Sequence, residues 1–487
     1  MRAHRRSVAL FAILTLALAV PALAQAPDRS APPAPGPPPA LRLPEIQKRS
    51  LSNGLPVRIV ELHKVPVVQI DLLVLSGAGS DAAGKYGMAS MVAAMLDEGA
   101  GSRSALEIAD AVDYLGASLS TGSSFDTSVV GLWVPVARLT DALPIMADVA
   151  LRPTFPPPEL ERLRKEQLTA MLQARDDPRS IAELAFPRIV FGVQNRYGTS
   201  ASGAPDAVNS FTVDDLRSFY RTCYRPSNAA LVVVGDVKAD LLMPQLEAAF
   251  GGWKDEGPLP ATVPVPNAPQ LAARQVYIID KPGAPQSQIR IGGVGVPRST
   301  PDYYAVQVLN TILGGSFTSR LNQNLREQHG YTYGAGSSFA MRRSAGPFVA
   351  SSGVQTEVTS DALKEFFNEL NGILKPVPSV ELARARNYVA LSFPGEFETA
   401  GDIARKLEES IVYRLPDDHF ATYVSRIEAV SEADVQRAAQ KYILPAKFAV
   451  VIVGDRKAIE AGVRALNLGP VKVMTIQEAL GPAVPVQ

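Results

Sequence analysis

The chain contains very little cysteine and histidine. Cys223 is the only cysteine among 487 residues, so no disulfide can form within the chain and its stability must come from packed cores. No two of its four histidines are spaced four residues apart, so no helix face presents the two imidazoles of a helical zinc site. The histidines are His4, His63, His329 and His419.

Net charge and long apolar segments are missing as well. Lysine plus arginine and aspartate plus glutamate each number 48, so the balance predicts neither a nucleic acid nor an anionic membrane surface as a partner. Beyond the first residues, no segment reaches the roughly 18 uninterrupted apolar residues of a membrane-spanning helix. A length of 487 residues is too great for one core and predicts two or more domains.

Residues 1–24 have the pattern of a secretory signal peptide. Three arginines precede an apolar run from Val8 to Val20, and Ala22-Leu23-Ala24 supplies the small residues of a cleavage site. The apolar run is too short for a stable membrane anchor. We expect cleavage after Ala24, export to a bacterial periplasm and no membrane span in the mature protein.

Residues 25–45 are dense in proline, which favours an extended, polyproline-like tether over a packed element. A spacer and a docking peptide both fit this composition.

Local patterns predict alternating strands and helices from residue 51 onward. Two β-rich runs open the folded part, and ASLSTGSSFDTSVVGLWVPV reads as a hairpin. Thr212 is followed by an expected helix that stops before Pro226, and Ala229–Val234 reads as a strand. Further helices are expected over residues 88–96, 104–115, 137–151, 158–175 and 179–190, and the first of these reads as buried on every side.

The second half of the chain repeats the first. NSFTVDDLRSFYRTCYRPSNAALVVVGDVKA at Asn209 aligns without a gap with EAVSEADVQRAAQKYILPAKFAVVIVGDRKA at Glu428, a shift of 219 residues. The same shift places PVVQIDLL at Pro66 on PQSQIRIG at Pro285. A repeat of this length indicates a domain duplication, in which each half has an α+β pattern and the proline-rich residues 254–272 form the linker.

The stretch GMASMVAAMLDEGA, which begins at Gly87, resembles the active-site helix of the insulinase/pitrilysin metallopeptidases. In that family a His-x-x-Glu-His sequence follows the same glycine, and in this register Ser90 and Ala94 replace the histidines while Ala93 replaces the glutamate. The position of the family's downstream glutamate ligand falls on Ala170. None of these side chains can bind zinc or act as a general base, so the resemblance implies the helix without its chemistry.

The resemblance covers about Leu51 to Val471 and implies a fold and a partner. It implies an α+β protein of two homologous domains, 46–253 and 273–475, followed by a tail at 476–487. Each domain would be a mainly antiparallel sheet with packed helices, in a clamshell arrangement with a partner subunit around a peptide substrate. In several pairs of this family one subunit carries the zinc site and the other does not. The resemblance therefore implies no cofactor in this chain and zinc in a homologous partner of a heterodimer.

A second segment, GGSFTSRLNQNLREQHGYTYGAGSSFAM, resembles the part of the family that completes the catalytic site from the domain opposite the zinc. The arginine and tyrosine of that site, seven residues apart, correspond to Arg326 and Tyr333. A helix ending near Gly330, followed by a strand with Tyr331 and Tyr333 on one face, would bring the pair together. A cation and a phenol suit a carbonyl oxygen that gains negative charge. The structural alternative is an arginine that serves a helix C-terminus and a core tyrosine.

Three functions are compatible with these features. The chain is either a zinc-less subunit that supplies Arg326 and Tyr333 to a zinc-bearing homologue, or a peptide-binding or structural scaffold without catalysis. The third is a homodimer that captures peptides as added strands at a sheet edge. The first two differ in whether Arg326 and Tyr333 matter for turnover.

Overall fold

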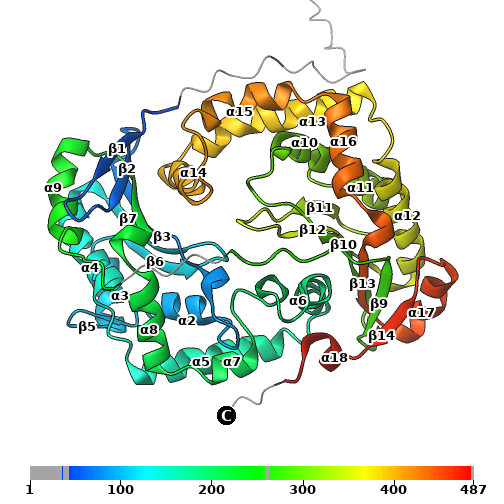
Figure 1. The fold of residues 1–487 in the computed structure, drawn as a ribbon, viewed down its shortest axis with the longest axis horizontal. Helices are drawn as coiled ribbons and strands as arrows, with labels where there is room; N and C mark the ends of the chain where they lie inside the picture. The colour runs from blue at the N-terminus through cyan, green and yellow to red at the C-terminus, as the bar shows by residue number, and fades with distance from the viewer. Residues whose placement is uncertain (1–35, 37–42, 258–263, 484–487) are drawn as a thin grey trace, which may run out of the picture. The chain divides into compact units, whose positions relative to one another are not determined.

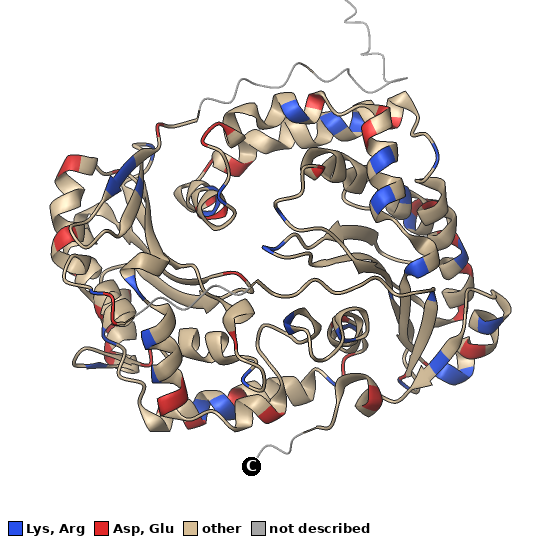
Figure 2. Ribbon diagram, viewed as in Figure 1, with Lys and Arg blue, Asp and Glu red and all other residues tan. Residues whose placement is uncertain are grey.

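Two six-stranded sheets form the framework of the computed structural model, which describes residues 36, 43–257 and 264–483 (Figure 1). The predicted signal peptide, most of the proline-rich segment after it and residues 258–263 of the predicted linker lie outside the described residues. Within the described ranges, no helix has the length and apolar character needed to cross a membrane. Basic and acidic residues are interspersed along the helices (Figure 2).

The first sheet has the strand order β1-β2-β8-β3-β7-β6, and only the β2–β8 pair is parallel. A two-stranded ribbon of β4 and β5 lies outside it. The strands are β1 (Gln47–Ser50), β2 (Pro56–Glu61), β3 (Val67–Val74), β4 (Gly99–Ala100), β5 (Arg103–Ser104), β6 (Ser118–Ser123), β7 (Ser128–Pro135) and β8 (Ala229–Gly235). The helices are α2 (Met88–Ala94), α3 (Ala105–Tyr114), α4 (Leu139–Leu151), α5 (Pro157–Gln173), α6 (Pro178–Phe191), α7 (Pro205–Asn209), α8 (Val213–Cys223) and α9 (Ala239–Phe250).

The second sheet has the order β11-β12-β10-β13-β9-β14, in which β9 is parallel to both β13 and β14. Its strands are β9 (Gln275–Asp280), β10 (Gln286–Val294), β11 (Ala335–Phe339), β12 (Pro347–Gln355), β13 (Ala449–Gly454) and β14 (Val471–Met474). The helices are α10 (Tyr303–Leu313), α11 (Arg320–Asn322), α12 (Thr359–Gly372), α13 (Ser379–Ser392), α14 (Ala400–Val412), α15 (His419–Glu428), α16 (Glu432–Tyr442), α17 (Arg456–Ala465) and α18 (Ile476–Leu480).

The sequence repeat is a structural repeat. β9 begins and ends 219 residues after β2, and α16 stands at the same offset from α8. The two sheets differ at one edge, where antiparallel β1 precedes β2 but parallel β14 comes from the far end of the chain. The predicted fold class, α+β with two homologous, mainly antiparallel sheets and packed helices, is confirmed.

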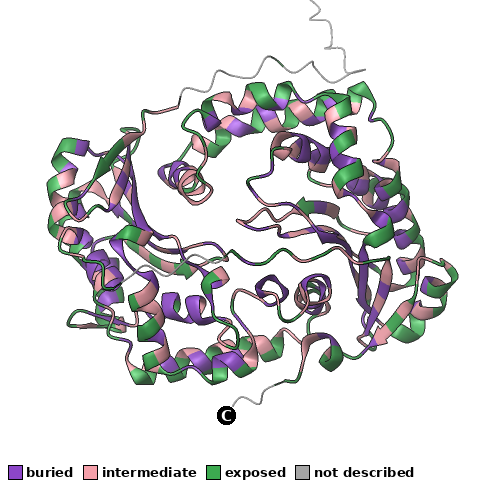
Figure 3. Cartoon of the chain, viewed as in Figure 1, coloured by how far each residue is buried: buried purple, intermediate pink, exposed green. Residues whose placement is uncertain are grey.

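Each half contributes one helix to the sheet of the other half. Every residue of β8 and of β13 is buried, which requires both faces of these strands to be covered. Helix α14 packs on the first sheet through Ile403 and Leu407, and α6 packs on the second through Ile181 and Phe186. The buried residues accordingly follow the strands and the inner helix faces (Figure 3).

The tips of two equivalent hairpins also join the halves. Asp126, at the β6–β7 turn, accepts hydrogen bonds from the backbone N–H of Arg343 (3.1 Å) and from the Tyr413 hydroxyl (3.0 Å). The Arg342 guanidinium lies 3.8 Å from the centre of the Phe125 ring. The two sheets are therefore linked by polar contacts as well as by the exchanged helices.

Two acidic residues lie in the contact between α14 and the first sheet. Asp71 on β3 is 5% exposed, and Glu408 of α14 lies against it. Desolvation, followed by the charge of Asp71, raises the pKa of Glu408 to about 8, and burial also raises the pKa of Asp71. Two adjacent carboxyl groups repel each other once both are ionised, so we expect the pair to hold one proton at neutral pH.

Glu408→Gln is therefore expected to stabilise the protein in neutral and alkaline buffer. The pKa of Glu408 in the folded protein lies above the usual value of 4.5, so the stability of this contact is fully present below about pH 4.5 and is lost as the pH rises through about 8. Glutamine keeps the shape and carries no charge. Melting temperatures measured from pH 5 to pH 9 should diverge, with a gain of several degrees at pH 9. The exposed Glu428→Gln is the control, and a constant difference between Glu408→Gln and wild type across this range would contradict the prediction.

Candidate functional site

Helix α2 occupies the position predicted for the zinc-site helix. Ser90 and Ala94, one turn apart, lie on its accessible side, since Ser90 is partly exposed and Ala94 is exposed. Ala93 is 1% exposed. The expectation of a helix buried on every side is wrong for this face, because α2 turns the Ser90–Ala94 side away from the sheet.

The accessible face of α2 is bonded to a nearby loop. The Ser90 hydroxyl donates to the carbonyl of Ala201 at 2.9 Å, and the side-chain amide of Gln167 on α5 donates to the carbonyl of Ser202 at 2.5 Å. Gly87, at φ +106°, is the N-cap of α2, and a Cβ there would lie 2.6 Å from the Ser202 carbonyl oxygen. The loop therefore ties together the two helices that carry the zinc-ligand positions.

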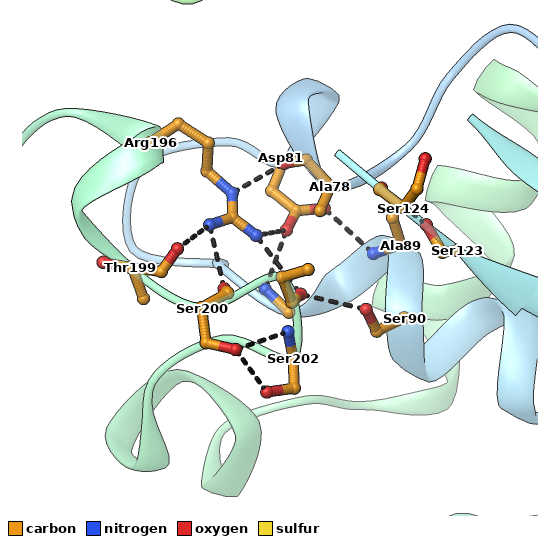
Figure 4. A network of polar contacts seen from close by, with 12 residues as sticks. Ala78, Asp81, Ala89, Ser90, Ser123, Ser124, Arg196, Thr199, Ser200 and Ser202 are labelled. Atoms are coloured by element: carbon orange, nitrogen blue, oxygen red, sulfur yellow. Dashed lines mark hydrogen bonds and ion pairs between the residues drawn. The ribbon is translucent and has the colours of Figure 1, made fainter. Parts of the chain in front are cut away.

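A buried ion pair holds the start of α2. The Asp81 carboxylate accepts hydrogen bonds from the backbone N–H groups of Gly87 (2.7 Å) and Ala89 (2.9 Å). Arg196 donates to the same carboxylate at 2.9 Å, and the two side chains are 0% and 4% exposed (Figure 4). Burial raises the pKa of Asp81, while the charge of Arg196 and the two backbone donors oppose that rise. The anion also suits the positive end of a helix.

Arg196 organises the loop that covers α2. It donates to the carbonyls of Ala78 (2.6 Å), Thr199 (3.0 Å) and Ser200 (3.0 Å), and its guanidinium lies 4.8 Å from the centre of the Tyr86 ring. Sequence reasoning missed both members of the ion pair. The only local signal was an aspartate six residues before the helix-capping glycine.

The remaining zinc-ligand position also lacks a donor. Ala170 is exposed on α5, and Glu166, one turn earlier, pairs with Arg162 at 2.9 Å. Arg162 also contacts Glu98 at 2.5 Å and Glu159 at 2.6 Å. In the part of the chain that the structure describes, no group of three or more His, Cys, Asp or Glu side chains could hold a metal ion. The residues at these positions do not fit zinc.

The purified chain is expected to retain less than about 0.1 zinc per molecule, because a stable site needs three or four suitable donors. Elemental analysis after dialysis against a weak chelator measures this content. The variant with Ser90→His, Ala93→Glu, Ala94→His and Ala170→Glu is the matched positive control and should retain more zinc. Close to one tightly held zinc per wild-type chain would overturn the prediction.

The helix that carries Arg326 ends where the sequence predicts. Arg326 lies in a π-helical segment, Gln323–Gln328, that continues α11. Gly330 follows at φ +66°, the left-handed conformation expected of a helix end. The predicted strand through Tyr331 and Tyr333 is wrong, because β11 begins only at Ala335.

A side-chain hydroxyl explains the late start of β11. Thr332 Oγ1 accepts from the backbone N–H of Gly334 at 3.0 Å and donates to the carbonyl of Gly353 at 2.7 Å. These bonds form a local turn where a strand would have backbone hydrogen bonds to its neighbour. Threonine hydroxyls commonly compete with regular secondary structure in this way. Residues 331–334 therefore form a loop beside β12.

Tyr333 projects from this loop into solvent. Its side chain is 92% exposed, and no other described residue makes a hydrogen bond to it. Tyr331 instead packs against the core and stacks on His329 at 4.9 Å. The alternative of a core tyrosine is therefore wrong for Tyr333.

The Arg326 side chain does not cap the end of its own helix. Its guanidinium lies 4.7 Å from the centre of the exposed Phe317 ring and 3.4 Å from the Glu327 carboxylate. Within the described ranges, no hydrogen bond joins Arg326 to Tyr333, and the Arg326 guanidinium donates to no helix carbonyl. Both side chains remain available to a molecule outside this chain.

Two family models match the chain. The model described as Insulinase (Peptidase family M16) matches residues 57–195, and the model described as Peptidase M16 inactive domain matches residues 210–389. The chain belongs to the M16 family of insulinase-like peptidases. The first match contains the degenerate zinc positions, and the second contains Arg326 and Tyr333.

Similar proteins of known sequence or structure span most of the chain. An uncharacterized zinc protease of Streptomyces coelicolor is 25% identical over 420 residues, 85% of this chain and 91% of its own. The solved structure of a peptidase M16 inactive domain from Pseudomonas fluorescens has a TM-score of 0.78 and 25% identity, covering 84% of this chain and 98% of its own. A protease from Helicobacter pylori, at 22% identity, has the same TM-score and covers 84% and 100%. The resemblance stated from the sequence is confirmed.

The M16 fold of this chain thus retains the framework of a zinc site without its donors. The buried Asp81–Arg196 pair positions α2, and the loop that contains Ala201 and Ser202 bonds it to α5. Ser90 and the alanines at the other ligand positions cannot activate water.

Proposed function

We propose that this chain is the zinc-less subunit of a periplasmic heterodimeric zinc peptidase. It pairs with a zinc-bearing M16 homologue and supplies Arg326 and Tyr333 in trans to the substrate at the partner's zinc site. The exposure of Tyr333 is the observation that carries the proposal. The Tyr333 hydroxyl is exposed and makes no hydrogen bond to any other described residue, so it is free to donate to another molecule. Tyr333 also stands at the position that the family resemblance gives to the catalytic tyrosine.

The chain has lost one part of the family's catalytic site and kept the other, which supports this role. The positions for zinc ligands hold serine and alanine, whereas the arginine and tyrosine of the second half are both present and accessible. A protein that acts only as a scaffold would not need to keep Arg326 and Tyr333 after losing the zinc ligands. Several similar proteins are named as uncharacterized zinc proteases, which supports peptide hydrolysis by the assembled pair.

The chemical role follows from the two side chains. A guanidinium is permanently charged, and a phenol donates one hydrogen bond. Aimed at the carbonyl oxygen of a scissile peptide bond, both stabilise the negative charge that develops during attack by water. If residues 1–24 are a cleaved signal peptide, the subunit and its partner act in the periplasm.

Reconstitution tests the proposal. Neither this chain nor a zinc-bearing homologue alone should cleave a peptide efficiently, and the equimolar mixture should. A homologue that is fully active by itself and unaffected by this chain would favour the second candidate, a peptide-binding or structural scaffold. The buried anchoring of α2, which needs no metal, is compatible with that candidate.

A further inference from the structure

A polar cavity of about 450 Å³ lies in the second half of the chain. It is lined by α10, by α11 with its π-helical continuation, and by α12 and α13, which lie near one another in Figure 1. This volume is in the usual range for small-ligand sites, about 300–1,000 Å³. Neither Arg326 nor Tyr333 lines the cavity, so it is separate from the catalytic role proposed above.

Two opposite charges in the cavity lack ionic partners. Glu369 comes from α12 and Arg384 from α13, and neither forms an ion pair with any residue that the structure describes. The other two charged lining residues, Arg320 and Glu381, pair with each other at 2.7 Å. One carboxylate and one guanidinium are therefore left for a ligand.

Asn324 adds an unpartnered acceptor at the cavity wall. The residue is 7% exposed, and its amide nitrogen donates to Glu365 (3.0 Å) and Glu369 (2.8 Å). Its amide oxygen is buried and receives no hydrogen bond from the described residues. A buried acceptor without a donor is unfavourable, and native proteins rarely leave one without a reason.

The domain repeat shows that the fold does not require this arrangement. In the first half, the residues 219 positions earlier than Asn324, Glu369 and Arg384 are Ala105, Ala150 and Lys165. The Glu369 carboxylate, which has no ionic partner, and the Asn324 amide, whose oxygen receives no hydrogen bond, therefore belong to the second half alone. A feature present in only one copy of a duplicated domain is better explained by a local function than by folding.

We propose that this cavity binds a small zwitterion, namely a short peptide with free termini. Its ammonium group lies against Glu369, which Asn324 orients through a hydrogen bond, and its carboxylate pairs with Arg384. Ile312, Ala385 and Tyr388 supply apolar wall for the peptide side chains. The two charged contacts at opposite ends of one ligand explain why the cavity holds one unpaired charge of each sign.

Calorimetric titration of the full mature chain with trialanine tests this site. Capping either end of the probe, as N-acetyl-trialanine or trialanine amide, should weaken binding about tenfold or more, because each cap removes a charge-assisted contact. Free alanine is a further probe. If it binds as tightly and shows the same dependence on the variants below, the zwitterion site stands and free amino acids are its ligands.

Two variants separate the ends of the ligand. Glu369→Gln should weaken the binding of trialanine but not that of the acetylated peptide, and Arg384→Met should weaken trialanine but not its amide. The exposed Asp361→Asn on α12 is the matched control and should leave binding unchanged. Undetectable binding of trialanine at millimolar concentration, or equal losses for capped and uncapped peptides in both variants, would overturn the proposal.

Discussion

Tyr333→Phe is expected to slow peptide cleavage by the reconstituted pair about 100-fold, a loss of roughly 3 kcal/mol of transition-state stabilisation. The change removes one hydroxyl from a side chain that is 92% exposed and makes no hydrogen bond to any other described residue, so folding should not suffer. Single-turnover cleavage of a fluorogenic peptide measures the effect. Tyr114→Phe, on a tyrosine that is 82% exposed on α3, is the matched control and should be silent.

Arg326→Ala should impair turnover to a similar degree. If Arg326 and Tyr333 act on the same oxygen, the double variant should lose less than the sum of the two single losses. Substrate affinity and subunit pairing should change much less, because the contact forms mainly in the transition state. Cleavage rates within about twofold of wild type for both single variants, with pairing intact, would favour the scaffold.

Asp81→Ala is expected to cause the largest loss of stability. Removing one partner of a buried ion pair leaves the other charge without compensation, which typically costs about 3–5 kcal/mol. Here the Arg196 guanidinium would remain buried, and the backbone N–H groups of Gly87 and Ala89 would lose their acceptor. We therefore also expect α2 to lose its fixed position in the Asp81→Ala variant.

Urea unfolding of the isolated chain measures this effect. Asp214→Asn, on an aspartate that is 95% exposed and pairs with Arg217 at 3.8 Å, is the control and should leave the midpoint nearly unchanged. An Asp81→Ala midpoint equal to that of this control would show that the buried pair does not hold the helix.

Much of the fold could be predicted because its signals are local or repeated. Thr212 forms a capping box with Asp215 at the start of α8, and the left-handed Gly330 ends the helix of Arg326. The 219-residue repeat extended these local signals to both halves. Short-range patterns of this kind depend on nearby residues, so tertiary context rarely overrides them.

Other features depend on contacts that no local pattern records. Asp81 and Arg196 are 115 residues apart, and the Asp71–Glu408 pair joins different halves. The helix end near Gly330 and the placement of Tyr331 and Tyr333 on one face favoured a strand, but the Thr332 hydroxyl forms a local turn instead. The exposure of Tyr333 follows from that turn and could not be read from the sequence.

Purification of the chain from its native source under mild conditions is the most direct test of the proposed subunit role. We predict an equimolar homologue that carries a His-x-x-Glu-His sequence, about one zinc per pair, and peptide cleavage by the complex. A chain that purifies alone or only with copies of itself, with neither zinc nor peptidase activity in its fractions, would contradict the proposal.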